Sequence, residues 1–369
     1  MKKKLQIISQ VNLVEEASGI LSIWINREED MQKLWQKYSG NFQDRPDELR
    51  ECRDLLQEIY HSVKEHLSGK KERIEYYFKS RAADFSTLGH LALLWNNQKY
   101  DNSLQSYEER FAGMTEAQKV KQFAEIIDID ATLNTSLSTI NTAADLIAFI
   151  EASAYENEVK WEAIKIFTRQ EVYYNEVCSI LREIVELLQD SYGERINRLG
   201  QKFYDYWTGV QQESDIKDIL QEMTKVTWQS SEAGIILMPV IFQPFGIGIY
   251  TEDEDRSLMD ILRVGILIDR HFILKNKEIS KEEIVEAGKL LSDKSKVDIL
   301  ELVSKRPCYG KELSNVLKLS TATISYHVNA LHGMGLLKAD INANKVYYSL
   351  NRERLLEYLD QIKEYFMKL

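Results

Sequence analysis

The spacing of hydrophobic residues changes along the chain, and each change marks a different kind of structure. From Val11 to about Val226, apolar residues recur every three or four positions, in segments such as LRECRDLLQEIYHSVKEHL and NEVCSILREIVELLQDSY. This is the spacing of amphipathic helices. One proline, Pro46, interrupts the region. The pattern therefore predicts an N-terminal domain built almost wholly of helices.

After Ser231 the apolar residues come in short runs rich in β-branched side chains. GIILMPVIF, FGIGIY and LRVGILI are separated by Gln-Pro and by the acidic loop TEDEDRS, which predicts two or three antiparallel strands. Gly246 and Gly248 do not complete a dinucleotide-binding motif, because Thr251 stands where the third glycine is needed and the acidic loop would repel a pyrophosphate. A bulge or a close approach of strands explains these glycines better.

The segment 280–369 predicts helices, a turn and a hairpin in a fixed order. Ser280 and Glu283 have the spacing of a capping box, and Pro307 ends the second helix. A short helix, YGKELSNVLK, a three-residue turn and a helix capped by Ser320 follow. LLKADINANKVYYSL then predicts a hairpin turning at 342–344, before a last helix. This is the order of a winged helix-turn-helix.

The helix that begins after Ser320 has an unusual outer face. Ile324, Val328 and Leu331 make its inner face apolar, whereas the outer face carries short hydrogen-bonding groups in place of charge. In a winged helix-turn-helix this helix enters the major groove, where hydroxyl and amide groups pair with bases and an alanine contacts a thymine methyl. Lysines on either side are spaced to meet phosphates. The residues predicted to contact DNA are Lys311, Lys318, Ser320, Thr321, Ala322, Thr323, Ser325, Tyr326, Asn329, Asn344 and Lys345.

Charge is distributed unevenly along the chain. The whole chain has a net charge of −11, whereas 280–369 contains 14 basic and 12 acidic residues. An acidic body joined to a mildly basic C-terminal segment is compatible with nucleic-acid binding by that segment. The alternative function is a helical protein-interaction scaffold whose winged helix binds protein rather than DNA.

Leu290–Leu350 resembles the DNA-binding domain of the ArsR/SmtB family of bacterial regulators. The resemblance lies in LSDKSKVDIL, in the helix-turn-helix ELSNVLKLSTATISYHVNALHGMGLL and in the closing wing strand KVYYSL. It covers about the last quarter of the chain, so the protein is expected to be a larger variant with an added N-terminal helical domain. The resemblance implies a transcriptional regulator, a repressor by expectation, whose partner is double-stranded DNA.

The residues with which the family binds metal are not repeated here. Members that sense metal carry a cysteine pair around ELCVCDL, whereas the matching segment RPCYGKEL offers Cys308 alone. Other members use Asp and His in the last helix, which has no histidine in this chain. His327 and His332 are five residues apart, off the spacing of a helical chelate. No metal site is therefore expected at the family's usual positions.

The last helix carries a hydrophobic stripe that we interpret as a dimer interface. Its members are spaced 4, 3 and 4 residues apart, and two tyrosines widen the stripe. Family members pair through their terminal helices, which favours a homodimer; the alternative is a helix that only folds back onto its own winged helix. The predicted interface residues are Leu355, Leu359, Ile362 and Phe366.

Further motifs limit the remaining functional classes. The sequence has no Gly-Lys-Ser phosphate loop, G-x-S-x-G or HExxH, so an enzyme is not expected and no cofactor is assigned. Three scattered cysteines fit a reducing compartment, and the longest apolar run, Ala233–Phe242, is too short to span a bilayer. We expect a cytoplasmic protein with no membrane association.

Together these patterns predict a mainly α fold with an N-terminal helical domain, a short antiparallel β element and a C-terminal winged helix-turn-helix. The expected boundaries are 1–229 for a helical sensor or scaffold domain, 230–279 for the small β element and linker, and 280–369 for the DNA-binding domain. An unidentified small-molecule effector is expected in the N-terminal domain, although no motif names it.

Overall fold

The computed structural model of the chain confirms the mainly α fold. None of the helices that it describes is both long and apolar enough to cross a membrane. The residues described are 4–26, 33, 35, 46–81, 87–95, 103–127, 139–153, 155–213, 215–224, 226–228, 233–250, 259–268, 281–342 and 345–367.

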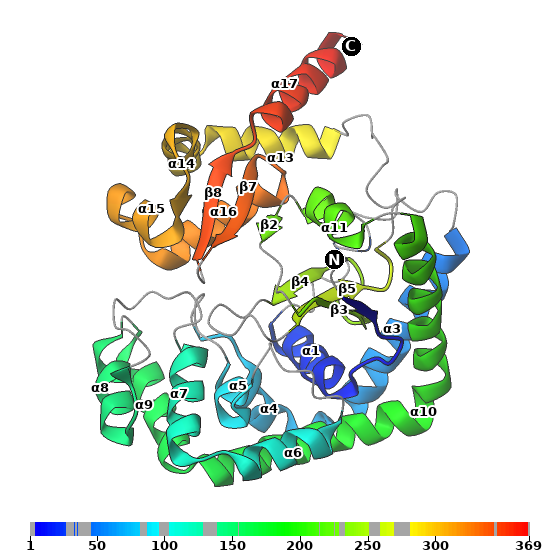
Figure 1. Ribbon diagram of the computed structural model, residues 1–369, viewed down its shortest axis with the longest axis vertical. Coiled ribbons are helices and arrows are strands. Elements are labelled where there is room, and N and C mark those ends of the chain that lie inside the picture. The colour runs from blue at the N-terminus through cyan, green and yellow to red at the C-terminus, as the bar shows by residue number, and fades with distance from the viewer. Residues whose placement is uncertain are drawn as a thin grey trace. The chain divides into compact units, whose positions relative to one another are not determined.

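The chain folds into two compact units, and it passes between them three times (Figure 1). The first unit consists of Met1–Glu213 and Ser230–Phe272. The second consists of Ser214–Gln229 and Ile273–Leu369. The small β element therefore belongs to the first unit, and a short segment from the middle of the chain belongs to the second.

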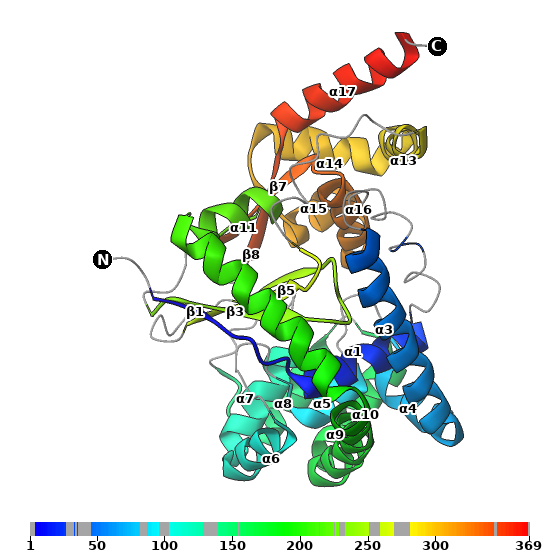
Figure 2. The same cartoon turned by 90° about the vertical axis from the view of Figure 1, so that its right-hand side faces the viewer.

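Helices make up most of the first unit, as the three- and four-residue spacing predicts. Helix α10 is its longest element and packs against α1, α3, α5 and α9 (Figures 1 and 2). The elements of this unit are β1 (Leu5–Ile7), α1 (Leu13–Asn26), α3 (Pro46–His66), the 3-10 helix η2 (Ser68–Lys70), α4 (Lys71–Phe78), α5 (Leu88–Leu93), α6 (Leu104–Gly113), α7 (Glu116–Ile127), α8 (Ala143–Ala152), α9 (Asn157–Thr168), α10 (Gln170–Glu213), β3 (Ile235–Val240), β4 (Ile247–Tyr250) and β5 (Asp260–Gly265).

The sheet of the first unit has the strand order β1-β3-β5-β4. Strands β4 and β5 pair antiparallel, as the sequence pattern predicts. Strand β3 instead pairs with β5 in parallel, and β1 pairs with β3 in parallel. The expected antiparallel pairing is therefore confirmed for β4 and β5, whereas β3 pairs in parallel because β4 lies on the far side of β5 from β3. The chain after β3 must therefore cross β5 before it reverses.

Two acidic side chains of α1 tie this helix to the sheet. Glu16 is 4% exposed and accepts hydrogen bonds from the backbone N–H groups of Ile241 (2.7 Å) and Phe242 (2.8 Å), just after β3. Burial raises the pKa of Glu16 to about 7, against the effect of those two donors. The neighbouring Glu15 accepts from Arg263 Nη2 of β5 at 2.6 Å. Charge on α1 thus lies inside the unit because each carboxylate has partners there.

The segment between β1 and α1 crosses α10 at Gly200. A Cβ at that position would lie 2.0 Å from the carbonyl oxygen of Ser9, closer than real side chains approach. Glycine at 200 therefore allows the N-terminal segment to run directly against the long helix.

The second unit contains the helices, turn and hairpin in the predicted order, together with two strands that the sequence pattern did not predict, β2 and β6. Its sheet has the order β2-β7-β8-β6. The elements are α11 (Ile216–Thr224), β2 (Val226–Trp228), α13 (Lys281–Ser292), α14 (Lys294–Lys305), β6 (Cys308–Tyr309), α15 (Gly310–Leu317), α16 (Thr321–Gly333), β7 (Leu337–Asn342), β8 (Lys345–Leu350) and α17 (Arg352–Met367).

Candidate nucleic-acid interface

The turn between α15 and α16 is fixed by local hydrogen bonds. Lys318 has a φ of 54°, a left-handed conformation that ends α15. Ser314 Oγ donates to the carbonyl oxygen of Leu319 at 2.7 Å. Ser320 Oγ then accepts from the Thr323 N–H at 3.0 Å, so Ser320 caps α16 as predicted. These contacts set the angle at which α16 leaves the turn.

The inner face of α16 is buried as its spacing predicts. Ile324, Val328 and Leu331 are 1%, 2% and 0% exposed. They lie in one hydrophobic cluster with Ile299 of α14 and Leu313 of α15. Because the other helices of the unit hold this face, the opposite face of α16 is directed outward.

The outer face of α16 carries the polar residues predicted to read DNA. Tyr326 is 68% exposed, and Ser320 and Asn329 are also exposed. Thr321, Thr323 and Ser325 are half-buried, and the Ser320 and Thr323 hydroxyls lie 2.8 Å apart. The backbone of Ala322 lies in α16, but its side chain is outside the described residues.

Asp293, the N-cap of α14, and Lys296 of α14 lie close to this outer face. Sequence reasoning did not single out either residue. Lys296 is 7% exposed, its Nζ donates to Asp293 Oδ2 at 2.8 Å, and its ammonium lies 5.7 Å from the centre of the Tyr326 ring. The hydrogen bond from Lys296 lowers the pKa of Asp293. The sequence did contain a signal for Lys296: it lies three and seven positions before Ile299 and Val303, on the same buried face of the helix. This pair places a positive charge beneath an exposed aromatic ring.

His327 follows Tyr326 on α16 but turns inward. It is 8% exposed, and burial lowers its pKa, so the imidazole is neutral near pH 7. The imidazole therefore packs within its own unit.

The predicted lysine contacts fall at separate places around α16. Lys311 is half-buried in the first turn of α15, and Lys318 is exposed just after α15. Lys345 begins β8, opposite Asn342 in the antiparallel pair that closes the hairpin. Asn344 and the side chain of Lys345 lie outside the described residues. The hairpin itself, β7 with β8, is confirmed.

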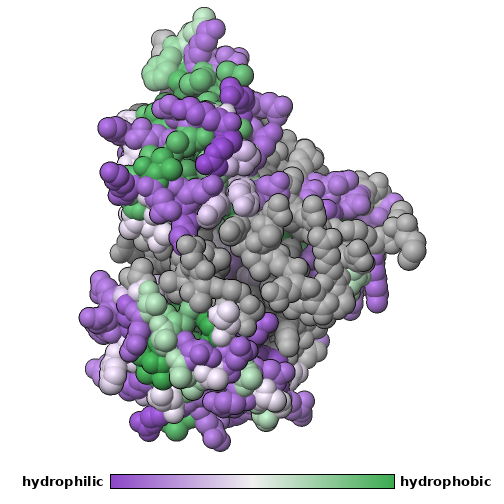
Figure 3. All heavy atoms as spheres, turned by 60° about the vertical axis from the view of Figure 1, so that its left-hand side comes forward, coloured by the Kyte–Doolittle hydropathy of each residue, from purple (hydrophilic) through white to green (hydrophobic). Residues whose placement is uncertain are grey.

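The hydrophobic stripe of α17 is wider than a single packing face. Leu355 packs against the core of its own unit, and Ile362 packs around Tyr358, which is 2% exposed. Leu359 and Phe366 remain 46% and 58% exposed. Leu356 and Met367 extend this exposed edge, and Figure 3 shows hydrophobic atoms in green reaching the surface at the top, where α17 ends. The four predicted interface residues thus divide between two edges of one stripe.

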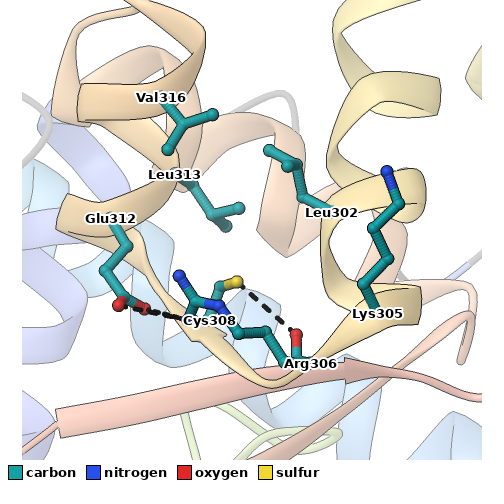
Figure 4. Close-up of a pocket in the computed structure, with 7 residues that line it drawn as sticks. All are labelled: Leu302, Lys305, Arg306, Cys308, Glu312, Leu313 and Val316. Carbon is teal, nitrogen blue, oxygen red and sulfur yellow. Dashed lines mark hydrogen bonds and ion pairs between the residues drawn. The ribbon is translucent and has the colours of Figure 1, made fainter.

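A small cavity opens between α14 and α15 (Figure 4). Its volume is about 170 Å³, and its walls include Leu302, Leu313 and Val316. Cys308 is 4% exposed beside it, with Sγ 3.5 Å from the Arg306 carbonyl oxygen, and burial raises the pKa of the thiol. Across the part of the chain that the structure describes, no three His, Cys, Asp or Glu side chains come together in a way that could hold a metal ion.

Known proteins resemble the second unit. Residues 293–339, from the N-cap of α14 into β7, match the family described as "Bacterial regulatory protein, arsR family". The "Arsenical resistance operon repressor" of Staphylococcus xylosus is 34% identical over 83 residues, which are 22% of this chain and 79% of that protein. The "Cadmium resistance transcriptional regulatory protein CadC homolog" of Staphylococcus aureus is 28% identical over 89 residues, 23% of this chain and 74% of that protein. No solved structure matches the chain. The ordered helix-turn-helix, its wing and these matches together show that the chain belongs to the arsR family of bacterial regulatory proteins.

Proposed function

We propose that this DNA-binding transcriptional regulator reads a specific two-fold operator and represses transcription there. The observation that carries the proposal is the division of α16 between an inner face fixed in the core and an outer face of uncharged polar side chains. Such a face can approach base edges closely, because long charged side chains do not hold it away. Tyr326 and Asn329 are exposed on this face and are proposed as base readers, together with Ser325.

Three lysines are proposed to hold the domain on the DNA backbone. Lys311 and Lys318 lie at the two ends of α15, and Lys345 lies at the base of the wing tip. Contacts with phosphates from both sides of α16 would set its register in the groove without reading sequence.

The two-fold operator follows from the proposed dimer. The edge of α17 formed by Leu356, Leu359, Phe366 and Met367 is exposed in the single chain and apolar, which supports its burial against a second copy. A two-fold dimer would place its recognition helices about 34 Å apart, one turn of DNA. The name of the Staphylococcus xylosus relative supports repression rather than activation.

The first unit is proposed to respond to an effector, a small molecule of unknown identity, or to act as a scaffold. Its size supports a role beyond DNA contact, since it contains all of Met1–Glu213 and the strands β3 to β5.

The proposal is tested by measuring DNA affinity of the full chain over a salt series. Replacing Lys311, Lys318 and Lys345 by alanine should weaken binding to all sequences and reduce the salt slope by about 0.9 for each phosphate that the variant no longer neutralises. The control replaces Lys79, Lys121 and Lys202, which are exposed lysines of the first unit, and changes net charge equally.

An affinity and slope equal to those of the parent would reject the three contacts. A parent chain that shows no preference among DNA sequences, or prefers a protein partner, would reject the proposed function itself.

A further inference from the structure

The wing sheet has a fourth strand that comes from the middle of the chain. Strand β2 pairs in parallel with β7, with Val226 opposite Ala339, Thr227 opposite Asp340 and Trp228 opposite Ile341. It forms the edge of the sheet β2-β7-β8-β6. The hairpin of β7 and β8 is complete without β2, so this strand is an addition to the wing.

The position of β2 along β7 places it close to the wing tip. The last of its pairs, Trp228 with Ile341, lies directly beside the pair of Asn342 and Lys345 that closes the hairpin. A strand paired at this point restricts the bending of the distal half of β7. It therefore also restrains the backbone at the start of β8, where Lys345 pairs with Asn342; the proposed function assigns Lys345 to a phosphate contact.

The segment that contains β2, Ser214–Gln229, is joined to the first unit at both of its ends. The chain leaves the first unit at Glu213, the last residue of α10, and re-enters it at Ser230, two residues after β2. Between these points lie α11 and β2, which contact each other. A change in the first unit that alters the path of the chain at Glu213 or Ser230 must be absorbed within this short segment.

We propose that β2 couples the first unit to DNA binding by bracing the wing. While β2 is paired with β7, the wing tip is held in the orientation that contacts phosphate. When a change in the first unit draws β2 away, the wing loses this support and DNA affinity falls. A parallel ladder of three residues suits this role, because short parallel pairing is weak and can open locally while the rest of the domain stays folded. The inference rests on the proposed function, in which the wing contacts DNA.

The test compares a variant in which the β2–β7 hydrogen bonds are disrupted with a control that lacks the same side chains but keeps those hydrogen bonds. Neighbouring strand residues turn their N–H groups to opposite sides, so replacing both Thr227 and Trp228 by proline removes whichever N–H faces β7. The matched control replaces the same two residues by alanine, which removes the same side chains and keeps both N–H groups. Hydrogen exchange and DNA affinity over a salt series are measured on the full chain.

The proline variant is expected to exchange faster than the alanine control at the amides of β7, while α16 keeps the slow exchange of a folded helix. Its DNA affinity should fall below that of the control, with a salt slope smaller by about 0.9 for each phosphate that the wing no longer neutralises. Glu16→Gln should destabilise the first unit, because an amide replaces the carboxylate that accepts from Ile241 and Phe242. Adding it should raise β7 exchange in the alanine control and change nothing further in the proline variant.

Three outcomes would overturn the inference, and they can be told apart. Equal affinity of the proline and alanine variants would show that β2 does not support the wing in DNA binding. If Glu16→Gln leaves the β7 exchange rate of the alanine control unchanged, the first unit does not act through β2. A parent chain that binds no DNA would overturn the proposed function, and this inference with it.

Discussion

Serine substitutions at Leu359 and Phe366 test the proposed dimer through the exposed edge of α17. The two side chains are 46% and 58% exposed in the single chain, so serine should disturb the fold of the second unit little. Ile362 is not suitable for the same experiment because it packs around the buried Tyr358. A substitution there would combine the loss of a dimer with damage to the core.

The expected magnitude follows from the surface that is still uncovered. Burying a leucine or phenylalanine completely stabilises by about 2 kcal/mol, so covering the exposed half of each contributes about 1 kcal/mol. A two-fold interface contains each residue twice, and the double substitution therefore removes about 4 kcal/mol, or roughly a thousandfold in the dimer dissociation constant.

Analytical ultracentrifugation over a concentration series measures this constant, and circular dichroism checks that the variant is folded. The matched control replaces Val285 of α13 and Val297 of α14 by serine, because they are similarly exposed, at 48% and 41%. We expect the control to dimerise like the parent. A folded Leu359 and Phe366 variant with the dimer constant of the parent would place the interface elsewhere.

The remaining predictions concern the stability of each unit. In Glu16→Gln, an amide NH₂ faces one of the two backbone N–H groups from which the carboxylate accepts hydrogen bonds. The substitution should therefore lower the free energy of unfolding of the first unit by about 1–3 kcal/mol. Urea titrations measure this, and an unchanged midpoint would contradict it. Leu331→Ala removes a fully buried side chain from the second unit and should cost about 2–5 kcal/mol in the same assay, whereas a cost below that range would mean that the site collapses around the smaller residue. Burial lowers the pKa of His90 from 6.5 to about 4, so the unfolded chain binds this proton more readily and stability should fall as pH drops from 6.5 towards 4. The stability of His90→Asn should not show the part of this decrease that comes from His90. Identical profiles of stability against pH for parent and variant would show that His90 does not cause it.

The second unit could be predicted well from sequence because its signals are local. Ser320 lies next to the helix that it caps, and Ile324, Val328 and Leu331 define the buried face within three turns. The hairpin of β7 and β8 joins segments that are adjacent in the chain, so alternation of side chains around a short turn was enough to find it.

Two of the strand pairings that sequence reasoning missed join segments far apart in the chain. Strands β1 and β2 have three residues each, which is too short for a periodic pattern, and they pair with partners more than 100 residues away. The parallel pairing of β3 and β5 depends on the side of β5 on which β4 lies, and no residue in the turns indicates that side.

Buried charges were missed for the same reason. Glu15 meets Arg263 across 248 positions of sequence. Glu16 stands at helical spacing from the buried Ile20, and an acidic residue on an otherwise apolar face was the signal that its partners lie inside the fold.

The measurement that tests the central claim most directly is a binding-site selection from random duplex DNA, carried out with the full parent chain, with Tyr326→Ala and with Ser325→Ala. The parent should return a motif with two-fold symmetry and half-sites one helical turn apart. Each variant should lose preference at one position of each half-site, where the missing base interaction costs about 1–3 kcal/mol, while the spacing of the half-sites stays the same. Recovery of the same motif by the parent and both variants would contradict the assignment of α16 as the reader, and recovery of no motif by the parent would contradict sequence-specific binding.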